Sequence, residues 1–261
     1  MTRTPKLAPR ILTVKDAFYL TANMIRVVFK GPELAGIYEG CAGANCKIFL
    51  PTIGQSRVDF VTQFTDGPPP AKRTYTVRAY RADVQEMDID FVAHGDEGPA
   101  SAWAIRAKTG DFLGFAGPSE VKIKDFYADW YLIAADMSAL PVASAAIEAM
   151  PRNAKGVAIF EVISADDVLK LDIPKSMDVH WLIQGDPHTA STAQEGFIRN
   201  MDWPSGVVQT CVAGESGVIK AIRNYFTKDR ALPRADVYIS GYWKIGLIED
   251  QHQIEKRKDL V

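Results

Sequence analysis

The chain has 261 residues, 47% of them hydrophobic and 24% charged, and its 30 basic and 32 acidic residues give a net charge of −2. This composition is ordinary for one large globular domain or two smaller ones, and the near-neutral balance gives no reason to expect binding to nucleic acid or to a membrane surface. Because the sequence shows no apolar leader, no apolar run of about 18 residues and an odd number of cysteines at non-motif spacings, we expect a cytoplasmic protein without disulfides or structural zinc.

The first half of the chain consists of short apolar or alternating segments separated by turns. After a loose arm that reaches about residue 9, this pattern predicts strands over residues 11–15, 24–30, 47–51, 75–80, 87–92 and 111–116. One clear helix is expected among them, over residues 99–108. Short strands with frequent turn signals and a single helix indicate a small antiparallel barrel.

From about residue 125, apolar runs alternate with helical patterns. The strands are expected over residues 130–134, 157–163, 179–183, 207–212 and 236–240, and the helices over 139–150, 192–200 and 218–226. Such continuously apolar strands are typical of a parallel sheet that is covered on both faces. We therefore predict an antiparallel barrel domain over residues 1–124, an α/β domain over 125–247 and a charged C-terminal tail over 248–261.

The stretch Arg73-Thr74-Tyr75-Thr76-Val77-Arg78 opens the strand expected at 75–80, directly after a proline-rich turn. A dinucleotide such as FAD needs a flat surface for its ring, hydrogen bonds to the ring's polar edge and cations for its pyrophosphate. Tyrosine, threonine and arginine supply these in turn. The stretch therefore predicts a flavin cradle, and composition alone also allows a solvated edge strand.

A series of ordered motifs along nearly the whole chain resembles the siderophore-interacting protein family of bacterial ferric-siderophore reductases. The motifs are R-x-Y-T-x-R at 73–78, D-F-V-x-H at 90–94, G-P-A-S-x-W-A at 98–104, A-D-M-S-A-L-P at 135–141, A-G-E-S-G at 213–217 and G-Y-W-K-x-G at 241–246. The resemblance implies a flavoprotein of the ferredoxin-reductase type, in which an antiparallel FAD-binding barrel precedes a parallel-sheet domain that binds NADH or NADPH.

The segment 90–101 runs from a strand end through a glycine-containing loop into a helix. The free N–H groups of a helix's first turn and the helix dipole favour an anion, here the FAD diphosphate. For His94 a surface loop position is the alternative, and for Trp103 it is core packing. With this resemblance, the expected FAD contacts are Arg73, Thr74, Tyr75, Thr76, Val77, Arg78, Asp90, Val92, His94, Gly98, Ala100, Ser101 and Trp103.

Two similar turns follow strands of the second domain, which lacks the G-x-G-x-x-G fingerprint after its first strand. Ser138 is expected to cap a helix and contact an anion, and the turn around Gly214 repeats this layout at the sheet's carboxyl edge. Ordinary turn chemistry is the alternative for both, and Glu215 in particular fits a helix cap. The expected NAD(P)H contacts are Asp136, Ser138, Ala139, Gly214, Glu215 and Ser216.

The choice of electron donor depends on charges beyond the second parallel strand. Glu161 and the pair Asp166-Asp167 would repel a 2′-phosphate, which favours NADH over NADPH. Lys170 or Lys175 could fold back and reverse this preference. The family resemblance also leaves reduced ferredoxin open as the donor.

An anionic ferric siderophore, the acceptor that the resemblance implies, requires cations near the flavin. Lys47, Lys124 and Lys244 are the candidates, with Trp243 as a wall of the pocket, although each lysine alone fits a solvated surface position. The leading hypothesis is an FAD-dependent reductase that passes electrons from NAD(P)H or a ferredoxin to a ferric siderophore. A general flavin reductase and a non-catalytic siderophore carrier are the alternatives. The four histidines are scattered, so metal-centred and hydrolytic chemistry rank low.

Overall fold

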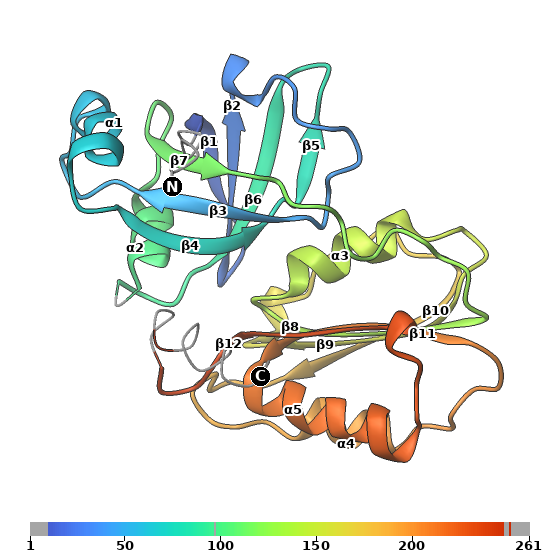
Figure 1. Ribbon diagram of the computed structural model, residues 1–261. Coiled ribbons are helices and arrows are strands. Elements are labelled where there is room, and N and C mark those ends of the chain that lie inside the picture. The colour runs from blue at the N-terminus through green and yellow to red at the C-terminus, as the bar shows by residue number, and fades with distance from the viewer. Residues whose placement is uncertain (1–9, 97, 248–250, 252–261) are drawn as a thin grey trace, which may run out of the picture. The chain divides into compact units, whose positions relative to one another are not determined.

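The computed structural model describes residues 10–96, 98–247 and 251, which form two compact units (Figure 1). Of the described residues, the first unit comprises 10–20, 25–96 and 98–121, and the second comprises 21–24, 122–247 and 251. The short turn Thr21–Met24 thus belongs with the second unit although it joins two strands of the first. The expected N-terminal arm and almost all of the tail 248–261 lie outside the described residues.

The first unit is built on a sheet of seven strands within the described residues, in the order β4-β3-β7-β1-β2-β6-β5. Two α-helices, α1 (Arg57–Asp66) and α2 (Pro99–Arg106), and the 3-10 helix η1 (Pro32–Leu34) accompany it. The strands are β1 (Arg10–Thr21), β2 (Met24–Lys30), β3 (Asn45–Leu50), β4 (Ala71–Thr76), β5 (Ala79–Arg81), β6 (Glu86–Val92) and β7 (Phe112–Ala116). Its described pairs β1–β7, β3–β4, β3–β7 and β5–β6 are all antiparallel, as predicted.

The strand predicted at 75–80 is wrong in one respect, because the chain is divided there between two strands. β4 pairs with β3 and β5 pairs with β6, so these strands form the two edges of the sheet although only Val77 and Arg78 separate them in sequence. Val77 N donates to Ala44 O at 2.9 Å, and Arg78 N donates to Asp88 O at 2.9 Å. The motif stretch therefore crosses from one edge of the sheet to the other, which is how an antiparallel sheet curls into a barrel.

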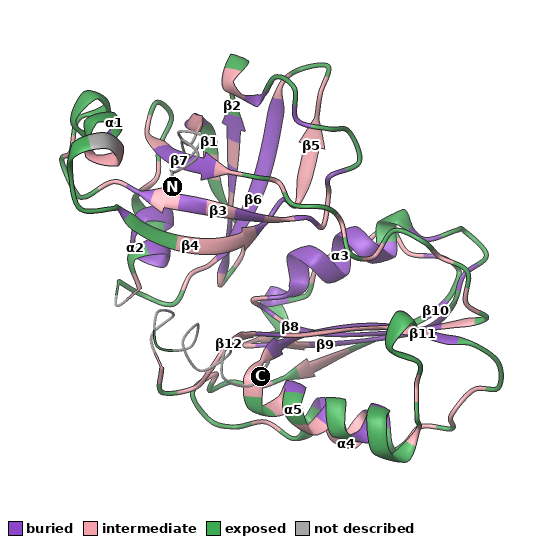
Figure 2. Cartoon of the chain, in the orientation of Figure 1, coloured by how far each residue is buried: buried purple, intermediate pink, exposed green. Residues whose placement is uncertain are grey.

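Helix α1 was not expected, so the prediction of a single helix among the strands is wrong. Ser56 caps it, since its Oγ accepts a hydrogen bond from Asp59 N at 3.1 Å. Its inner face packs Phe60 against Phe64 and Phe112. The outer face of α1 is largely exposed (Figure 2) and carries Val58 and Val61. Because apolar residues thus lie on both faces, the sequence lacks the apolar periodicity that predicts a helix.

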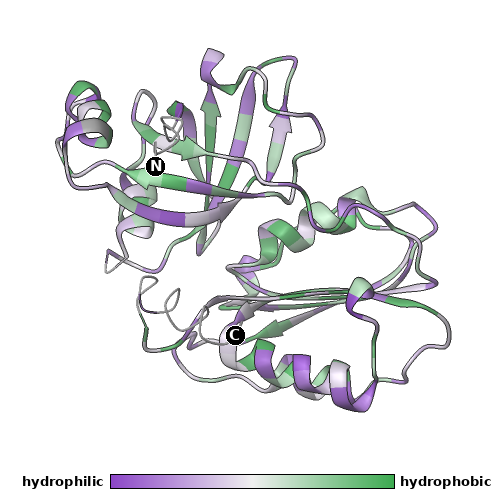
Figure 3. Ribbon diagram, in the orientation of Figure 1, coloured by the Kyte–Doolittle hydropathy of each residue, from purple (hydrophilic) through white to green (hydrophobic). Residues whose placement is uncertain are grey.

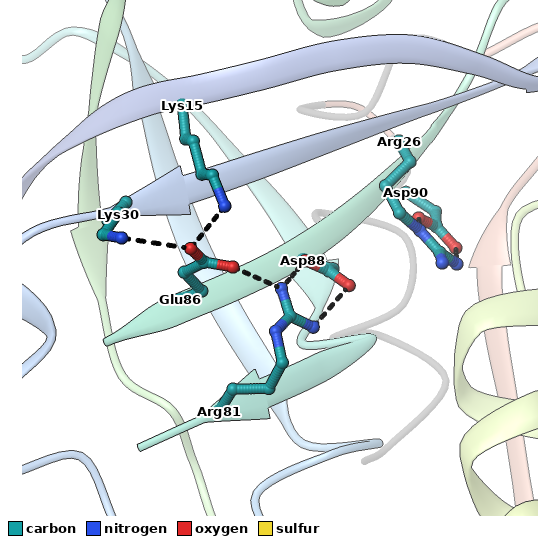
Figure 4. A network of polar contacts seen from close by, with 7 residues as sticks. All are labelled: Lys15, Arg26, Lys30, Arg81, Glu86, Asp88 and Asp90. Carbon is teal, nitrogen blue, oxygen red and sulfur yellow. Dashed lines mark hydrogen bonds and ion pairs between the residues drawn. The ribbon is translucent and has the colours of Figure 1, made fainter. Parts of the chain in front are cut away.

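Strand β6 alternates between the apolar core and a row of buried acids. Met87, Ile89 and Phe91 are fully buried in the core. The residues that alternate with them, Glu86, Asp88 and Asp90, point to the other face of the strand and are also buried. Cations from β1, β2 and β5 pair with all three acids, as Figure 4 shows. The cations are Lys15, Arg26, Lys30 and Arg81.

The second unit contains a parallel sheet of five strands within the described residues, in the order β10-β9-β8-β11-β12. Helix α3 lies on one face of the sheet and helices α4 and α5 on the other (Figure 1). The strands are β8 (Trp130–Asp136), β9 (Lys155–Val162), β10 (Ser176–Ile183), β11 (Val208–Glu215) and β12 (Val237–Trp243). The helices are α3 (Leu140–Ala149), α4 (Ala193–Asn200), α5 (Ser216–Asn224), 3-10 turns η2 (Ala165–Asp167) and η4 (Arg234–Asp236), and the π-helical turn η3 (Tyr225–Asp229).

The hydropathy of these helices matches their positions (Figure 3). Helix α3 is buried continuously from Leu140 to Ile147. Helix α5 alternates apolar and polar residues and places Ile219 and Ile222 in the core with Val212 of β11. An antiparallel barrel followed by a parallel α/β domain is the predicted fold class, and it is confirmed. No helix in the described part of the chain is long and apolar enough to cross a membrane.

Candidate functional site

In the first unit, the candidate flavin surface is the end of β4. Tyr75 is half-buried, and its ring centroid lies 4.5 Å from that of Phe91 in the core. The phenol ring is thus held on one side by apolar packing, as a stacking surface for a flat ring requires. Thr76 and Val77 are buried beside it, whereas Arg73 and Thr74 are half-buried.

A residue predicted to bind the siderophore and a residue predicted to bind FAD are neighbours on this surface. Lys47 of β3 lies opposite Thr74 of β4 in the strand register, and Lys47 Nζ donates a hydrogen bond to Thr74 Oγ1. The structure therefore places one cation of the expected siderophore site directly beside the expected flavin strand.

Arg78 lies in a buried ion network that the sequence did not reveal. Asp90, whose side chain is 3% exposed, receives a bidentate pair of bonds from Arg26 Nε at 2.7 Å and Arg26 Nη2 at 2.8 Å. Arg78 Nε lies 4.0 Å from the same carboxylate. Asp90 is thus placed to orient Arg78, and its contact with FAD stays a prediction. Arg26 was missed, and its signal is an arginine between the buried residues Ile25 and Val27 of an otherwise apolar strand.

The loop before α2 is fixed by Ser101, which is 1% exposed. Its Oγ accepts a hydrogen bond from His94 N at 3.0 Å and donates one to Gly95 O at 2.7 Å. A Cβ at Gly98 would lie 2.8 Å from His94 Cε1, so the imidazole packs directly against this glycine. The Ser101 hydroxyl is therefore engaged in holding the loop, and the Gly98–Ser101 backbone remains the predicted anion contact.

Helix α2 begins at Pro99 with Gly98 as its N-cap, and this N-cap provides no side-chain hydrogen bond. Such a helix end offers backbone N–H groups to an anion. Trp103 packs 6.3 Å from the Phe29 ring and 5.7 Å from the Phe91 ring, which is the core position named as its alternative. Val92 ends β6, and Ala100 lies in the barrel core. These residues fit FAD. Tyr75 suits its flat ring, and the half-buried Arg73 and Arg78, with the N-terminus of α2, suit its negatively charged phosphates.

In the second unit, Asp136 joins the ends of three strand segments at the carboxyl edge of the sheet. Its Oδ1 accepts hydrogen bonds from Ser138 N at 2.9 Å and Ser138 Oγ at 2.6 Å. Its Oδ2 accepts from Glu215 N at 2.8 Å and from Trp243 Nε1 at 2.7 Å. Burial raises the pKa of this carboxyl, and the four hydrogen bonds oppose the rise only in part.

This arrangement overturns one expectation about the turns and bears out the alternative given for Glu215. Ser138 does not cap α3, whose N-cap is Ala139 without a side-chain bond, because the Ser138 hydroxyl turns back to Asp136. Glu215 does cap α5, since its Oε2 accepts from Gly217 N at 2.5 Å and from Val218 N at 3.0 Å. Contact of these residues with NAD(P)H stays a prediction.

Two glycines allow this close packing. A Cβ at Gly214, where φ is +150°, would lie 2.7 Å from Asp136 Oδ2. A Cβ at Gly241 would lie 2.3 Å from Ser216 Oγ. The glycine at 214 thus lets β11 approach Asp136 of β8, and the glycine at 241 lets β12 approach Ser216 at the start of α5.

The acids named for donor choice differ in their surroundings. Asp167 is fully buried and accepts hydrogen bonds from Thr21 Oγ1, Asn23 N and Asn23 Nδ2, each at 2.8 Å. It also bonds to Ser164, so its charge is satisfied within the protein. The expectation that Asp167 repels a 2′-phosphate is therefore not supported by its surroundings. Glu161, by contrast, is half-buried at the end of β9.

The remaining acceptor candidates lie in the second unit. Lys124 is exposed, and Lys244 and Trp243 are half-buried directly after or at the end of β12. Their convergence with Lys47 on one pocket stays a prediction.

Comparison with known proteins finds a family model for each half of the chain. A family model described as siderophore-interacting FAD-binding domain matches residues 13–122, and one described as siderophore-interacting protein matches residues 128–246. The chain is 33% identical to the ferric vibriobactin reductase ViuB of Vibrio cholerae over 258 residues, which cover 96% of this chain and 95% of the relative. The chain belongs to the siderophore-interacting protein family. The family resemblance drawn from the motifs is thus confirmed.

Further members and neighbours share this organisation. The crystal structure of the siderophore-interacting protein SipS from Aeromonas hydrophila superposes with a TM-score of 0.84 at 31% identity and covers 97% of this chain and 98% of its own. The NADPH-dependent ferric-chelate reductase of Escherichia coli K12 is 27% identical and covers 93% of this chain and 99% of its own length. Ferredoxin-NADP+ reductase from Plasmodium falciparum, at 11% identity and a TM-score of 0.62, covers 92% of this chain and all of its own and shares the fold alone.

Proposed function

We propose that this siderophore-interacting protein is an FAD-dependent reductase that transfers electrons to a ferric siderophore. The observation that carries the proposal is the R-x-Y-T-x-R stretch at the join of the barrel's two edge strands, with Tyr75 packed on Phe91 and Arg78 beside the Arg26–Asp90 pair. The relatives named as ferric vibriobactin reductase and ferric-chelate reductase support the reaction class.

Residues of the barrel would bind and orient the cofactor. The half-buried Tyr75 ring would stack on the flavin ring, and Thr76, the next residue of β4, would supply hydrogen bonds to the polar ring edge. Arg78, held near Asp90, and the N-terminus of α2 would neutralise the diphosphate. When bound, the flavin supplies the redox chemistry, because it takes two electrons from a donor and passes them one at a time to ferric iron.

The donor proposed is a dihydronicotinamide nucleotide at the carboxyl edge of the parallel sheet, where open α/β folds bind ligands. Oxidation of one such nucleotide releases two electrons and a proton, which balance the reduction of two ferric ions to ferrous ions. A reduced ferredoxin would supply the same electrons singly. Ferrous iron binds hard-oxygen chelators more weakly than ferric iron, so reduction would release the metal, in our proposal within the cytoplasm.

The test is anaerobic reduction of the purified, FAD-loaded protein by NADH, NADPH and a reduced ferredoxin in turn, followed by a panel of ferric chelates. A yellow protein that bleaches with a donor and recovers its colour on adding a ferric siderophore is the expected result. A protein that binds no FAD would overturn the proposal. Bleaching followed by equal reoxidation with every chelate and with a neutral acceptor would indicate a general flavin reductase, and failure to bleach with any donor would indicate a carrier.

A further inference from the structure

Glu161 differs from the other acids at the carboxyl edge of the parallel sheet because its hydrogen bonds are incomplete. It lies on β9, which is paired with β8, and its Cα partner on β8 is Asp136. Ser191 Oγ donates to Glu161 Oε2 at 2.7 Å. Among the described residues, no hydrogen bond or ion pair is formed by Oε1, which leaves one carboxylate oxygen available as an acceptor.

Ser191 fixes the direction of this carboxylate. Its Oγ accepts a hydrogen bond from Ala193 N at 3.2 Å, the first residue of α4, while it donates to Glu161. Gln194, buried one residue further, donates from Nε2 to Ala135 O at 2.9 Å and thereby ties α4 to β8. The start of α4 is therefore anchored at β8 and β9, and Ser191, just before α4, holds the Glu161 carboxylate.

The electrostatic surroundings of Glu161 are acidic. Asp136 and Glu161 point to the same face of the sheet, since Ala134 and Ile159, two positions earlier on each strand, share one core cluster. Burial raises the pKa of Glu161, the bond from Ser191 opposes this, and the charge of Asp136 raises it further. No cation is among the groups that act on Glu161 within the described part of the chain.

We propose that Glu161 determines donor specificity, with its free oxygen accepting a hydrogen bond from the 2′-hydroxyl of an adenosine ribose and excluding a 2′-phosphate, so that this chain uses NADH rather than NADPH. This inference rests on the proposed function, in which the donor binds at this edge. In Rossmann-type dinucleotide sites, an acid near the end of the second strand binds the ribose hydroxyl, whereas a nearby arginine accommodates a 2′-phosphate, and Glu161 holds the corresponding position here although the glycine fingerprint is absent. The single available oxygen and the neighbouring Asp136 match the first arrangement.

The size of the effect follows from the charges. A unit negative charge about 6 Å from a carboxylate at an effective dielectric of about 20 weakens binding by about 100-fold, and hydration and salt reduce this to about tenfold. Glu161→Gln keeps the size of the side chain and an acceptor oxygen but removes the charge. It should therefore lower the ratio of kcat/KM for NADH to that for NADPH by about tenfold.

The experiment compares the FAD-loaded wild type, Glu161→Gln and the control Asp178→Asn. Asp178 is an exposed acid on β10 whose Cα partner is Val157, four residues before Glu161 and away from the carboxyl edge. Flavin reduction is followed with NADH and NADPH. In parallel, calorimetry measures binding of ADP and of 2′,5′-ADP, which reports on the ribose site without requiring turnover.

We expect the wild type and Asp178→Asn to prefer NADH and ADP by about tenfold or more, and Glu161→Gln to lose most of that preference. A wild type that prefers NADPH or 2′,5′-ADP, a protein that binds neither nucleotide, or a Glu161→Gln variant with unchanged ratios would overturn the proposal. If ADP binds with the expected preference but neither nucleotide reduces the flavin, the specificity site stands and the proposed donor is wrong.

Discussion

Replacing Asp136 tests whether one carboxylate organises the carboxyl edge of the parallel sheet. Asp136→Asn retains an oxygen for Ser138, but its amide NH2 group would face the N–H groups of Glu215 and Trp243, which now donate to Oδ2 at 2.8 Å and 2.7 Å. Two charge-assisted hydrogen bonds are lost. Since hydrogen bonds to charged groups contribute about 1.5–3 kcal/mol each, and the variant can relax in part, we expect the free energy of unfolding to fall by about 2–4 kcal/mol.

The assay is urea denaturation of a double-mutant cycle with Trp243→Phe, which removes the indole donor but keeps an aromatic ring. If the Asp136–Trp243 bond is direct, the double variant should lose about 1–2 kcal/mol less stability than the sum of the losses of the two single variants. Asp129→Asn, in the loop before β8 where the carboxylate accepts a bond from Val207 N at 2.9 Å, is a control without contact to Trp243. Additive effects of Asp136→Asn and Trp243→Phe, within about 0.3 kcal/mol, would refute the reasoning.

Three further predictions concern Arg78, Lys244 and Asp167. Arg78→Ala should weaken FAD by about tenfold or more and riboflavin by less, because only FAD carries a diphosphate, and titration of the apoprotein measures both. Lys244→Ala should slow reduction of an anionic iron chelate about tenfold at low salt and less at moderate salt, while a neutral acceptor is unaffected; an equal loss with both would indicate damage at the flavin. Asp167→Ala should cost about 3–5 kcal/mol in urea denaturation at neutral pH, with the exposed Asp166→Ala as a nearly neutral control. Burial raises the pKa of Asp167, but hydrogen bonds from Asn23, Thr21 and Ser164 outweigh it and lower the pKa below its ordinary value. The stabilisation is therefore fully present above about pH 4 and lost as the pH falls through the lowered pKa, so equal stabilities of wild type and Asp167→Ala at neutral pH would contradict the assignment.

The sequence predicted the fold well wherever one periodicity acted alone. The central parallel strands β8, β9 and β11 are mostly apolar and buried because both faces are covered, and all five strands were found with errors of up to a few residues at their ends. The prediction was wrong at two segments, residues 75–80 and helix α1, where the apolar pattern alone does not define the element. Val77 is buried like a strand residue, yet the chain changes strand partners there, which only tertiary pairing reveals. Helix α1 was missed because exposed Val58 and Val61 hide its polar face.

The candidate site shows a similar limit. Residue type identified Asp136, Ser138 and Glu215 as polar groups at strand ends, but it could not show where their hydrogen bonds go. In the structure Ser138 bonds to Asp136, and Glu215 caps α5. These contacts depend on strand order and register, because β8 and β11 are neighbours in space and more than 70 residues apart in sequence. Arg26 could not be assigned for the same reason, since its partner Asp90 is 64 positions away.

The number of hydrogen bonds on each carboxylate distinguishes Asp90, Asp136 and Asp167 from Glu161. Asp90 and Asp136 have partners on both carboxylate oxygens, as does Asp167, and in each case at least one donor comes from an element distant in sequence. A carboxylate that is fully satisfied within the protein gains little from a further donor, whereas removing one of its partners exposes a buried charge. Glu161 has a fixed orientation through Ser191 and one oxygen without a partner among the described residues. A group that is oriented but incompletely bonded is the arrangement that gains most from a ligand hydroxyl, and this reason, more than its negative charge, distinguishes Glu161 from its neighbours.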